Sequence, residues 1–222
     1  LQDATLTISE GGSLSIDANN ITFGTDSSIV VDGTLNLKLT EDFTVGSNFA
    51  KESKGIISCT DSFNLIVDTD FEGPINFDCT KNVTLENNKT VSFGTIKANT
   101  FTNKGTTIVN SNLSVGTVTN NGTLTIKEDS EIKNFSNNGS AIVNDSKTLK
   151  ITKKFNNGGT FTGKLNLSGS ELEQDIQLAE GGKNSVYETI EIDSSDKYIN
   201  FTGNPKIKKL KVVSAKSVSF YY

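Results

Sequence analysis

Residues 101–106 read Phe-Thr-Asn-Lys-Gly-Thr, and three later segments repeat this pattern. They are Val-Thr-Asn-Asn-Gly-Thr at 118–123, Phe-Ser-Asn-Asn-Gly-Ser at 135–140 and Phe-Asn-Asn-Gly-Gly-Thr at 155–160. Their first residues lie 17, 17 and 20 positions apart (118 − 101, 135 − 118 and 155 − 135). A period of this length indicates a stacked repeat. Asn-Gly favours a backbone with positive φ, so we expect each copy to form a turn.

A short β-rich run follows each turn: Thr107–Val109, Leu124–Ile126, Ala141–Val143 and Phe161. A strand, a turn and another strand in under about twenty residues leave no room for a crossover helix. The sequence therefore predicts an all-β, single-stranded parallel β-helix (β-solenoid) of about ten coils, right-handed by the rule for parallel crossovers. Asn side chains at equivalent turns are expected to form an amide ladder, with these candidates: Asn103, Asn120, Asn137 and Asn156.

The same period extends towards the N-terminus. One pattern, apolar residues at the first and third positions followed by Gly, occurs at Ile21–Thr25, Phe43–Ser47, Val91–Thr95 and Leu113–Thr117. We expect the Gly to end a strand at a corner of the coil. Cys59–Leu65 and Cys79–Leu85 also align, with a spacing of 20 (79 − 59). Residues 1–168 are therefore predicted to form regular coils of one solenoid.

The last quarter, residues 169–222, departs from this pattern. Residues 171–178 fit either a longer strand or one helical turn, and strands are expected at Ser185–Ile192, Tyr198–Phe201, Ile207–Val213 and Ser217–Tyr222. We read this section as irregular coils of the same solenoid, which either cap the stack or lead into more chain. It holds all four tyrosines and a lysine cluster, so we predict a binding region here: Tyr187, Tyr198, Lys206, Lys208, Lys209, Lys211, Tyr221 and Tyr222.

The composition excludes several kinds of site. The chain contains no His, Met, Trp or Arg. Without His there is no Ser-His-Asp or Cys-His triad, and most zinc sites are excluded as well. We predict no cofactor and no metal. The net charge is −5 and the charges are dispersed, so no nucleic-acid partner is expected.

No apolar run approaches membrane-spanning length and no signal peptide opens the chain, so we expect no membrane insertion of this segment. The missing initiator Met suggests a processed fragment. The two cysteines fall at equivalent places on adjacent coils, within disulfide range of each other. Two readings stay open: Cys59 and Cys79 form a disulfide, or they are two stacked, buried thiols.

Carboxylate pairs matter because parallel β-helices include polysaccharide lyases and hydrolases. The candidates are Asp26 with Asp32, Asp68 with Asp70, and Glu171 with Glu173. A glycosidase needs two carboxylates at a defined separation in a groove. The pectinolytic families also use Arg or His around their acids, and this chain has neither. We therefore interpret these residues as solvated turn charges.

The Asn-Asn-Gly-Thr-Leu-Thr texture, as in Asn120–Thr125, resembles the passenger regions of bacterial autotransporter adhesins, over roughly residues 5–167. The resemblance implies a secreted right-handed β-helix that serves as an adhesin, toxin or stalk. The leading hypothesis is a non-catalytic extracellular or cell-surface adhesin or structural stalk, with a host or cell-surface protein or glycan as its partner. The alternatives are a polysaccharide-active β-helix enzyme using Asp or Glu, and a self-assembling surface-layer component that associates end to end.

Overall fold

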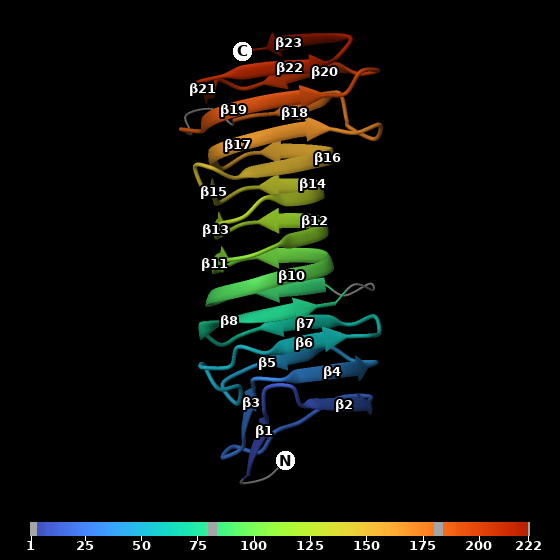
Figure 1. Ribbon diagram of the computed structural model, residues 1–222, viewed down its shortest axis with the longest axis vertical. Helices are drawn as coiled ribbons and strands as arrows, with labels where there is room; N and C mark the ends of the chain where they lie inside the picture. Colours follow the sequence, from blue (N-terminus) through green and yellow to red (C-terminus); the bar gives the residue numbers. More distant parts are fainter. Residues whose placement is uncertain (1–3, 80–83, 180–183, 222) are drawn as a thin grey trace.

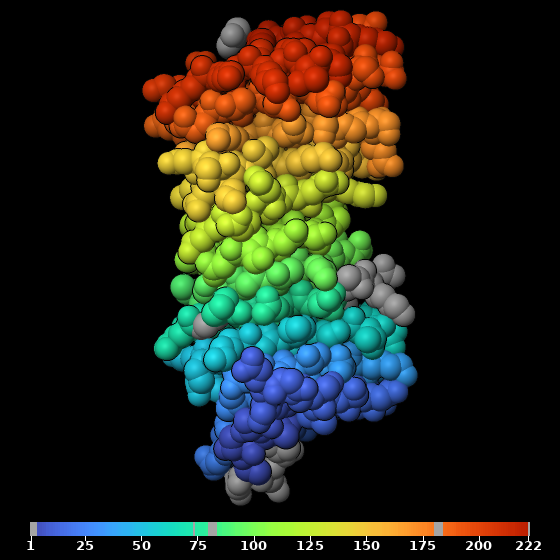
Figure 2. Space-filling view, viewed as in Figure 1, coloured from blue at the N-terminus to red at the C-terminus, as the bar shows by residue number. Residues whose placement is uncertain are grey.

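The computed structural model describes residues 4–79, 84–179 and 184–221. These residues contain no helix; their strands run parallel and wind into about ten stacked coils. Figure 1 shows the resulting rod, with the N-terminus at one end and the C-terminus at the other. In the space-filling view of Figure 2 each coil forms one band of colour lying directly on the band before it. The predicted all-β solenoid is confirmed.

The strands fall into an N-terminal, a central and a C-terminal group. The first group is β1 (Thr5–Ile8), β2 (Ser13–Ala18), β3 (Ser28–Val31), β4 (Thr34–Leu39), β5 (Phe43–Val45), β6 (Ile56–Cys59), β7 (Asn64–Val67), β8 (Phe71–Asp78) and β9 (Thr84–Asn87). The second is β10 (Thr90–Asn103), β11 (Thr106–Val109), β12 (Leu113–Asn120), β13 (Thr123–Ile126), β14 (Ser130–Asn137), β15 (Ser140–Val143), β16 (Thr148–Asn157) and β17 (Thr160–Ser168). The third is β18 (Asp175–Gln177), β19 (Val186–Asp193), β20 (Tyr198–Thr202), β21 (Lys206–Ile207), β22 (Leu210–Ser214) and β23 (Ser217–Tyr221).

Alternating side chains build the core. In β13, Leu124 and Ile126 are fully buried while Thr123 and Thr125 face outward, as expected of a strand with one buried face. Each inward residue lies next to its counterpart on the following coil, so like side chains form columns. Phe135 and Phe155, for example, are paired in register and stack with ring centroids 5.7 Å apart. The core is therefore one continuous column of Leu, Ile, Val and Phe along the rod.

A ladder of buried Asn side chains accompanies this core. The Nδ2 of each Asn donates to the Oδ1 of the next over the series Asn87, Asn103, Asn120, Asn137 and Asn157, at 2.7 Å in the last three steps. The predicted ladder is confirmed except for its last member, because Asn137 pairs with Asn157 and not with Asn156. Asn156 lies beside Ser136, one residue out of register, and its Oδ1 has no partner among the described residues.

The glycines of the repeated turns act differently from the prediction. The expected positive φ is wrong for Gly105, Gly122, Gly139 and Gly159, because the glycines with positive φ among the described residues are Gly11, Gly163, Gly169 and Gly203. At the turns the backbones of successive coils come too close for a side chain. A Cβ added to Gly122 or Gly139 would overlap the carbonyl oxygen of the glycine on the preceding coil. Glycine is required there by close backbone approach.

Corners do not always interrupt a strand. Gly94 and Gly116 lie inside β10 and β12, so the prediction that these glycines end their strands is wrong; the strand runs on through the corner, and pairing resumes at Ile96 in β10 and at Thr117 in β12. Residues 171–178 form neither a long strand nor a helical turn; only β18 is regular there. The expected strand at Ile207–Val213 is divided into β21 and β22. Pairing of β17 with β19 carries the ladder across residue 168 into the last quarter.

Candidate functional site

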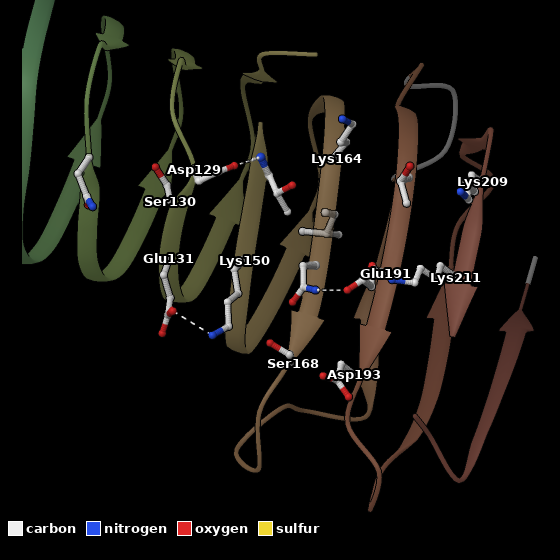
Figure 3. Close-up of a pocket in the computed structure, with 15 residues that line it drawn as sticks. Asp129, Ser130, Glu131, Lys150, Lys164, Ser168, Glu191, Asp193, Lys209 and Lys211 are labelled. Carbon is white, nitrogen blue, oxygen red and sulfur yellow. Dashed lines mark hydrogen bonds and ion pairs between the residues drawn. The ribbon is translucent and has the colours of Figure 1, made fainter. Parts of the chain in front are cut away.

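The candidate site is an open groove on one sheet of the rod. It crosses β14, β16, β17, β19 and β22 and encloses about 890 Å³ (Figure 3). Its lining is polar apart from Leu165 and consists of Asn112, Asp129, Ser130, Glu131, Thr148, Lys150, Lys164, Leu165, Asn166, Ser168, Thr189, Glu191, Asp193, Lys209 and Lys211. The groove extends from the regular coils into the irregular last quarter.

Strand alternation points these side chains outward. In β17, Leu165 and Leu167 are buried, and this places Lys164, Asn166 and Ser168 on the opposite face. In β19, buried Ile190 and Ile192 place Glu191 between them on the same outer face. The apolar core therefore fixes which polar residues line the groove, and the parallel register fixes which of them are neighbours.

The middle of the groove is a row of charged side chains and one amide, one residue from each strand. Register pairs Glu131 with Lys150, Lys150 with Asn166, Asn166 with Glu191 and Glu191 with Lys211. The Glu131 carboxylate lies 3.0 Å from the Lys150 ammonium, and Glu191 accepts from Asn166 Nδ2 at 3.1 Å and pairs with Lys211 at 2.7 Å. Figure 3 shows the contact between Glu131 and Lys150 and the hydrogen bond to Glu191 as dashed lines between neighbouring strands.

The row continues along the rod with a regular order of charge. Next to Glu131 come Ser114, Lys97 and Asp78, each paired in register with the one before. Lys97 and Asp78 form an ion pair at 3.2 Å. From Asp78 to Lys211 the order is acid, base, neutral, acid, base, neutral, acid, base. Each acid is thus followed by a lysine on the next coil, and this favours the observed register over a slipped one.

Two shorter rows flank the middle one. On one side Asp129 Oδ1 accepts from the backbone N–H of Thr148 at 2.7 Å, and Lys164 lies next to Thr148 in register. On the other side the Ser214 hydroxyl donates to Asp193 Oδ1 at 2.7 Å. The groove contains four lysines and four carboxylates, so its formal charges balance. It presents hydroxyl, amide, ammonium and carboxylate groups in fixed rows.

Two polar atoms of the groove have no partner within the part of the chain that the structure describes. They are Asn166 Oδ1 and Ser168 Oγ, both buried from solvent. Unsatisfied buried polar atoms are rare in folded proteins and mark places where a water or a ligand group adds a hydrogen bond. They lie on the same strand, β17, at the centre of the groove.

The carboxylates predicted as candidate acids lie elsewhere. Asp68 pairs with Lys89 at 3.4 Å, Asp70 Oδ1 accepts from the N–H of Thr90 at 2.9 Å, and Glu173 pairs with Lys154 at 3.2 Å. None of the six predicted carboxylates lines the groove. Within the groove, all four carboxylates already accept a hydrogen bond or form an ion pair with a neighbouring coil. A polysaccharide-active enzyme stays a prediction, without an observation that favours it.

The predicted binding region is divided by the fold. Lys209 and Lys211 line the groove, and Lys208 pairs with Glu188 at 2.7 Å. Lys206 lies on β21 and, like Tyr198 and Tyr221, is exposed. Tyr222 lies outside the described residues.

Tyr187 was wrongly assigned to a binding surface. Its side chain is fully buried, and its hydroxyl donates to the carbonyl of Leu178 at 2.7 Å and accepts from Asn157 at 3.2 Å. Burial raises the pKa of Tyr187 well above its usual value, which the hydrogen bond from Asn157 offsets only in part. Tyr187 closes the C-terminal end of the Asn ladder, so its role is structural.

The two cysteines form a disulfide. Cys59 ends β6 and Cys79 directly follows β8 on the next coil, and their Cα atoms are 4.4 Å apart. Both side chains are buried. The structure therefore settles the open choice between a bridge and two stacked thiols, and it ties two successive coils covalently.

Sequence reasoning missed most of the groove. The clustering of Lys209 and Lys211 indicates these two residues, whereas Glu131 and Lys150 belong to the coils predicted to be regular, and Glu191 lies on a predicted strand of the last quarter outside the predicted binding residues. A signal for two of them is present in the sequence: Lys150 and Glu191 are each the outward residue between two apolar inward ones, in Leu149-Lys150-Ile151 and Ile190-Glu191-Ile192. Aligning the coils on these apolar pairs would have displayed the alternating charges.

Comparison with known proteins adds no assignment: no family model, no curated protein and no solved structure matches this chain significantly. Among the described residues no three or more Cys, Asp or Glu side chains gather in a way that could hold a metal ion. A search of the same residues for a long apolar helix of membrane-crossing character finds none.

Proposed function

We propose that this chain is a non-catalytic extracellular or cell-surface β-helix, a stalk whose groove serves as an adhesive face. The observation that carries the proposal is the buried Cys59–Cys79 disulfide between successive coils. Disulfides persist in oxidising environments and are rare in the reducing cytosol. A bridge inside a regular solenoid therefore favours an extracellular location.

The stacking of the coils supports a role as a stalk. Parallel pairing runs from β2 to β23 through successive coils, and the apolar column and the buried Asn ladder accompany it. Each coil contacts only its neighbours, so the length of such a rod grows with the number of coils. At roughly 4.8 Å per coil, about ten coils give a rod on the order of 50 Å long.

The groove supports a role in adhesion. Its balanced charges give no long-range attraction for a polyanion, whereas its rows of hydroxyl, amide and charged groups can hydrogen-bond a polar ligand. Asn166 and Ser168 add two acceptor atoms without a protein partner. A glycan or a polar protein segment of the surrounding cells fits this chemistry.

Location is tested first. Intact source cells are treated with a membrane-impermeant label, and the state of Cys59 and Cys79 is determined by mass spectrometry after alkylation. The proposal predicts labelling and a bridged pair. Labelling only after lysis, with both thiols alkylated, would overturn it.

Adhesion is tested with the folded 222-residue chain on glycan arrays and host cells. The groove variant Lys150→Ala/Asn166→Ala should lose binding, whereas Lys153→Ala, an exposed lysine outside the groove, should retain it. Binding that both variants share would place the adhesive surface elsewhere. No binding by the wild-type chain would leave the stalk role alone.

A further inference from the structure

The middle row of the groove has an order of charge that inverts when its direction is reversed. From Asp78 to Lys211 the order is acid, base, neutral, acid, base, neutral, acid, base, with one residue from each coil. Reversal of the row exchanges every acid with a lysine and exchanges the two neutral residues with each other. The centre of this reversal lies between Glu131 and Lys150, which Figure 3 shows on neighbouring strands.

A second copy of the chain fits this order when the two groove faces meet with their rods antiparallel. The two-fold axis then runs parallel to the strands, between Glu131 and Lys150. Each charged residue of the row faces an opposite charge on the second copy, and each neutral residue faces a neutral one. The facing pairs are Asp78 with Lys211, Lys97 with Glu191, Ser114 with Asn166, and Glu131 with Lys150.

The centre of such a contact is a ring of charges. Within one chain the Glu131 carboxylate lies 3.0 Å from the Lys150 ammonium, and 60% of the Glu131 side chain and 44% of the Lys150 side chain are exposed. Across the axis each of these two side chains meets the opposite charge of the second copy, so acid and lysine alternate around the ring. A single exposed ion pair contributes little, whereas several that form one network contribute together.

The neutral positions join a hydroxyl to an amide. Asn166 Oδ1 is one of the two groove atoms that have no hydrogen-bond partner in the part of the chain that the structure describes. A hydroxyl is a donor for such an oxygen, and the Ser114 hydroxyl of the second copy lies opposite this amide. The uncharged positions therefore add to the match.

The flanking row through Asp129 accepts the same arrangement. Its members lie beside the middle row, one on each coil, and the same two-fold axis reverses them. Its facing pairs include Asp129 with Thr148, Lys164 with Asn112, and Lys209 with Asn76. No two like charges meet in this row, so it does not oppose the contact.

Other arrangements of the same two faces place like charges together. With the rods parallel and not displaced, each charged residue faces its own counterpart. With the rods antiparallel but displaced by one coil, Asp78 faces Glu191, and Glu131 faces Glu131 of the second copy. Like charges that face each other at an interface are unfavourable, so charge selects the antiparallel register centred on Glu131 and Lys150.

We propose that the adhesive face of this chain binds the same face of a second copy, with the two rods antiparallel. The inference rests on the proposed function, because it names the partner of that face. The contact is isologous and closes at two copies. The middle and flanking rows bring about twenty residues of each copy into the contact, close to the roughly 20–30 per partner of a specific interface. Rods that project from two facing cells meet antiparallel, so the contact joins cells that carry the same chain.

Self-association is tested by sedimentation velocity of the 222-residue chain over a range of concentrations. We expect an equilibrium between monomer and dimer, which is weaker at about 1 M than at about 0.1 M salt because salt screens the facing charges. Beads coated with the chain should cluster, and soluble chain should disperse them. A chain that stays monomeric at its highest soluble concentration, or that forms open-ended assemblies, would overturn the proposal.

Charge reversal at the centre tests the facing pairs. Glu131→Lys should weaken dimerisation by about tenfold or more, because the two-fold axis turns one substitution into two repulsive contacts. Glu131→Lys/Lys150→Glu should restore it, because the exchanged charges still face each other and the net charge is that of the wild type. The control Glu86→Lys breaks an equivalent ion pair, with Lys104 at 2.8 Å, outside the groove and should dimerise as the wild type does. An exchanged variant that dimerises no better than Glu131→Lys would contradict the proposed register.

The polarity of the dimer is tested by cross-linking with a short bismaleimide. Cys59 and Cys79 are bridged and do not react, so the only thiols are those introduced as Ser114→Cys and Asn166→Cys. A mixture of the two variants should cross-link in high yield, since these positions face each other. Each variant alone should cross-link poorly, because its two copies of the thiol lie three coils, about 14 Å, apart along the rod. Cross-links within each variant but none between them would overturn the antiparallel assignment.

Failure of this inference and failure of the adhesive function give different results. A monomeric chain that still binds glycans or host cells through the groove would overturn the second copy as partner and retain the adhesive face. Antiparallel dimers and clustered beads, with blank glycan arrays, would support the second copy as partner. Antiparallel dimers whose coated beads stay dispersed would support the contact and overturn its use in adhesion.

Discussion

Replacing Asn120 with Ala tests the buried ladder that runs beside the apolar core. Asn120 is fully buried; its Oδ1 accepts from Asn103 at 2.7 Å, and its Nδ2 donates to Asn137 Oδ1 at 2.7 Å and to the carbonyl of Ser140 at 2.9 Å. The substitution removes these three hydrogen bonds. It leaves one N–H of Asn103 and the Oδ1 of Asn137 buried without a partner.

The expected cost follows from those two orphaned groups. A buried donor or acceptor without a partner costs about 1–3 kcal/mol, so the free energy of unfolding should fall by about 2–6 kcal/mol. Asn121→Ala is the matched control, because Asn121 is the next residue but is exposed and only accepts from Asn138 at the surface. Its cost should stay within about 0.5 kcal/mol.

The stability of both variants is measured by urea unfolding, which is followed by circular dichroism. The urea midpoints are compared provided that the dependence of the free energy of unfolding on urea concentration is the same for both. Equal losses of stability in Asn120→Ala and Asn121→Ala, or an unchanged midpoint in Asn120→Ala, would contradict a stabilising role for the buried Asn ladder. Far-UV spectra at zero denaturant establish that both variants retain the wild-type fold.

Three further changes test the packing, the bridge and the buried phenol. Gly139→Ala should destabilise the chain by about 1–3 kcal/mol, since its Cβ meets the carbonyl of the coil before, whereas Gly46→Ala should be near neutral in the same urea assay because only Thr44 Cγ2 lies near, at 4.0 Å. The double variant Cys59→Ser/Cys79→Ser should lose about 3 kcal/mol, the value for a loop of this length; an unchanged midpoint would mean that the bridge adds no stability. In the unfolded chain Tyr187 loses its proton near pH 10, whereas in the folded chain burial keeps it protonated. The contribution of Tyr187 to the free energy of unfolding is therefore fully present below about pH 10 and falls as the pH rises above it. Tyr187→Phe should reduce that alkaline decline, and an identical pH profile for variant and wild type would contradict the burial of this phenol.

Much of the fold could be predicted from the repeats because one period controls both the strands and the turns. The Asn-Gly copies located the coils, and the spacing of Cys59 and Cys79 placed these two residues on adjacent coils, while the choice between a disulfide and two thiols stayed open. The errors came from local rules. Asn-Gly suggested positive φ, but Gly122 is required for another reason: the backbones of the stacked coils lie too close together for a side chain. That distance is a property of the tertiary structure.

The candidate site was less predictable, because its residues come from five coils and only the register brings them together. A lysine cluster in one coil, such as Lys208 to Lys211, is visible in a linear sequence. The row from Asp78 to Lys211 is visible only after each coil is aligned on its buried pair, and insertions shift that alignment. The coil at Phe155 shows the difficulty: an alignment wrong by one residue exchanged Asn156 for Asn157.

One outward row of side chains runs along the rod with one residue from each coil, and distances along this row can be measured directly. Spin labels are attached at Ser58 and at Ser114, Lys150 or Lys211, which the register places three, five and eight coils away. At about 4.8 Å per coil, electron-electron resonance should give separations of about 14, 24 and 38 Å, increasing linearly with coil number. Separations that do not increase with coil number would contradict the stacked rod and the groove built on it.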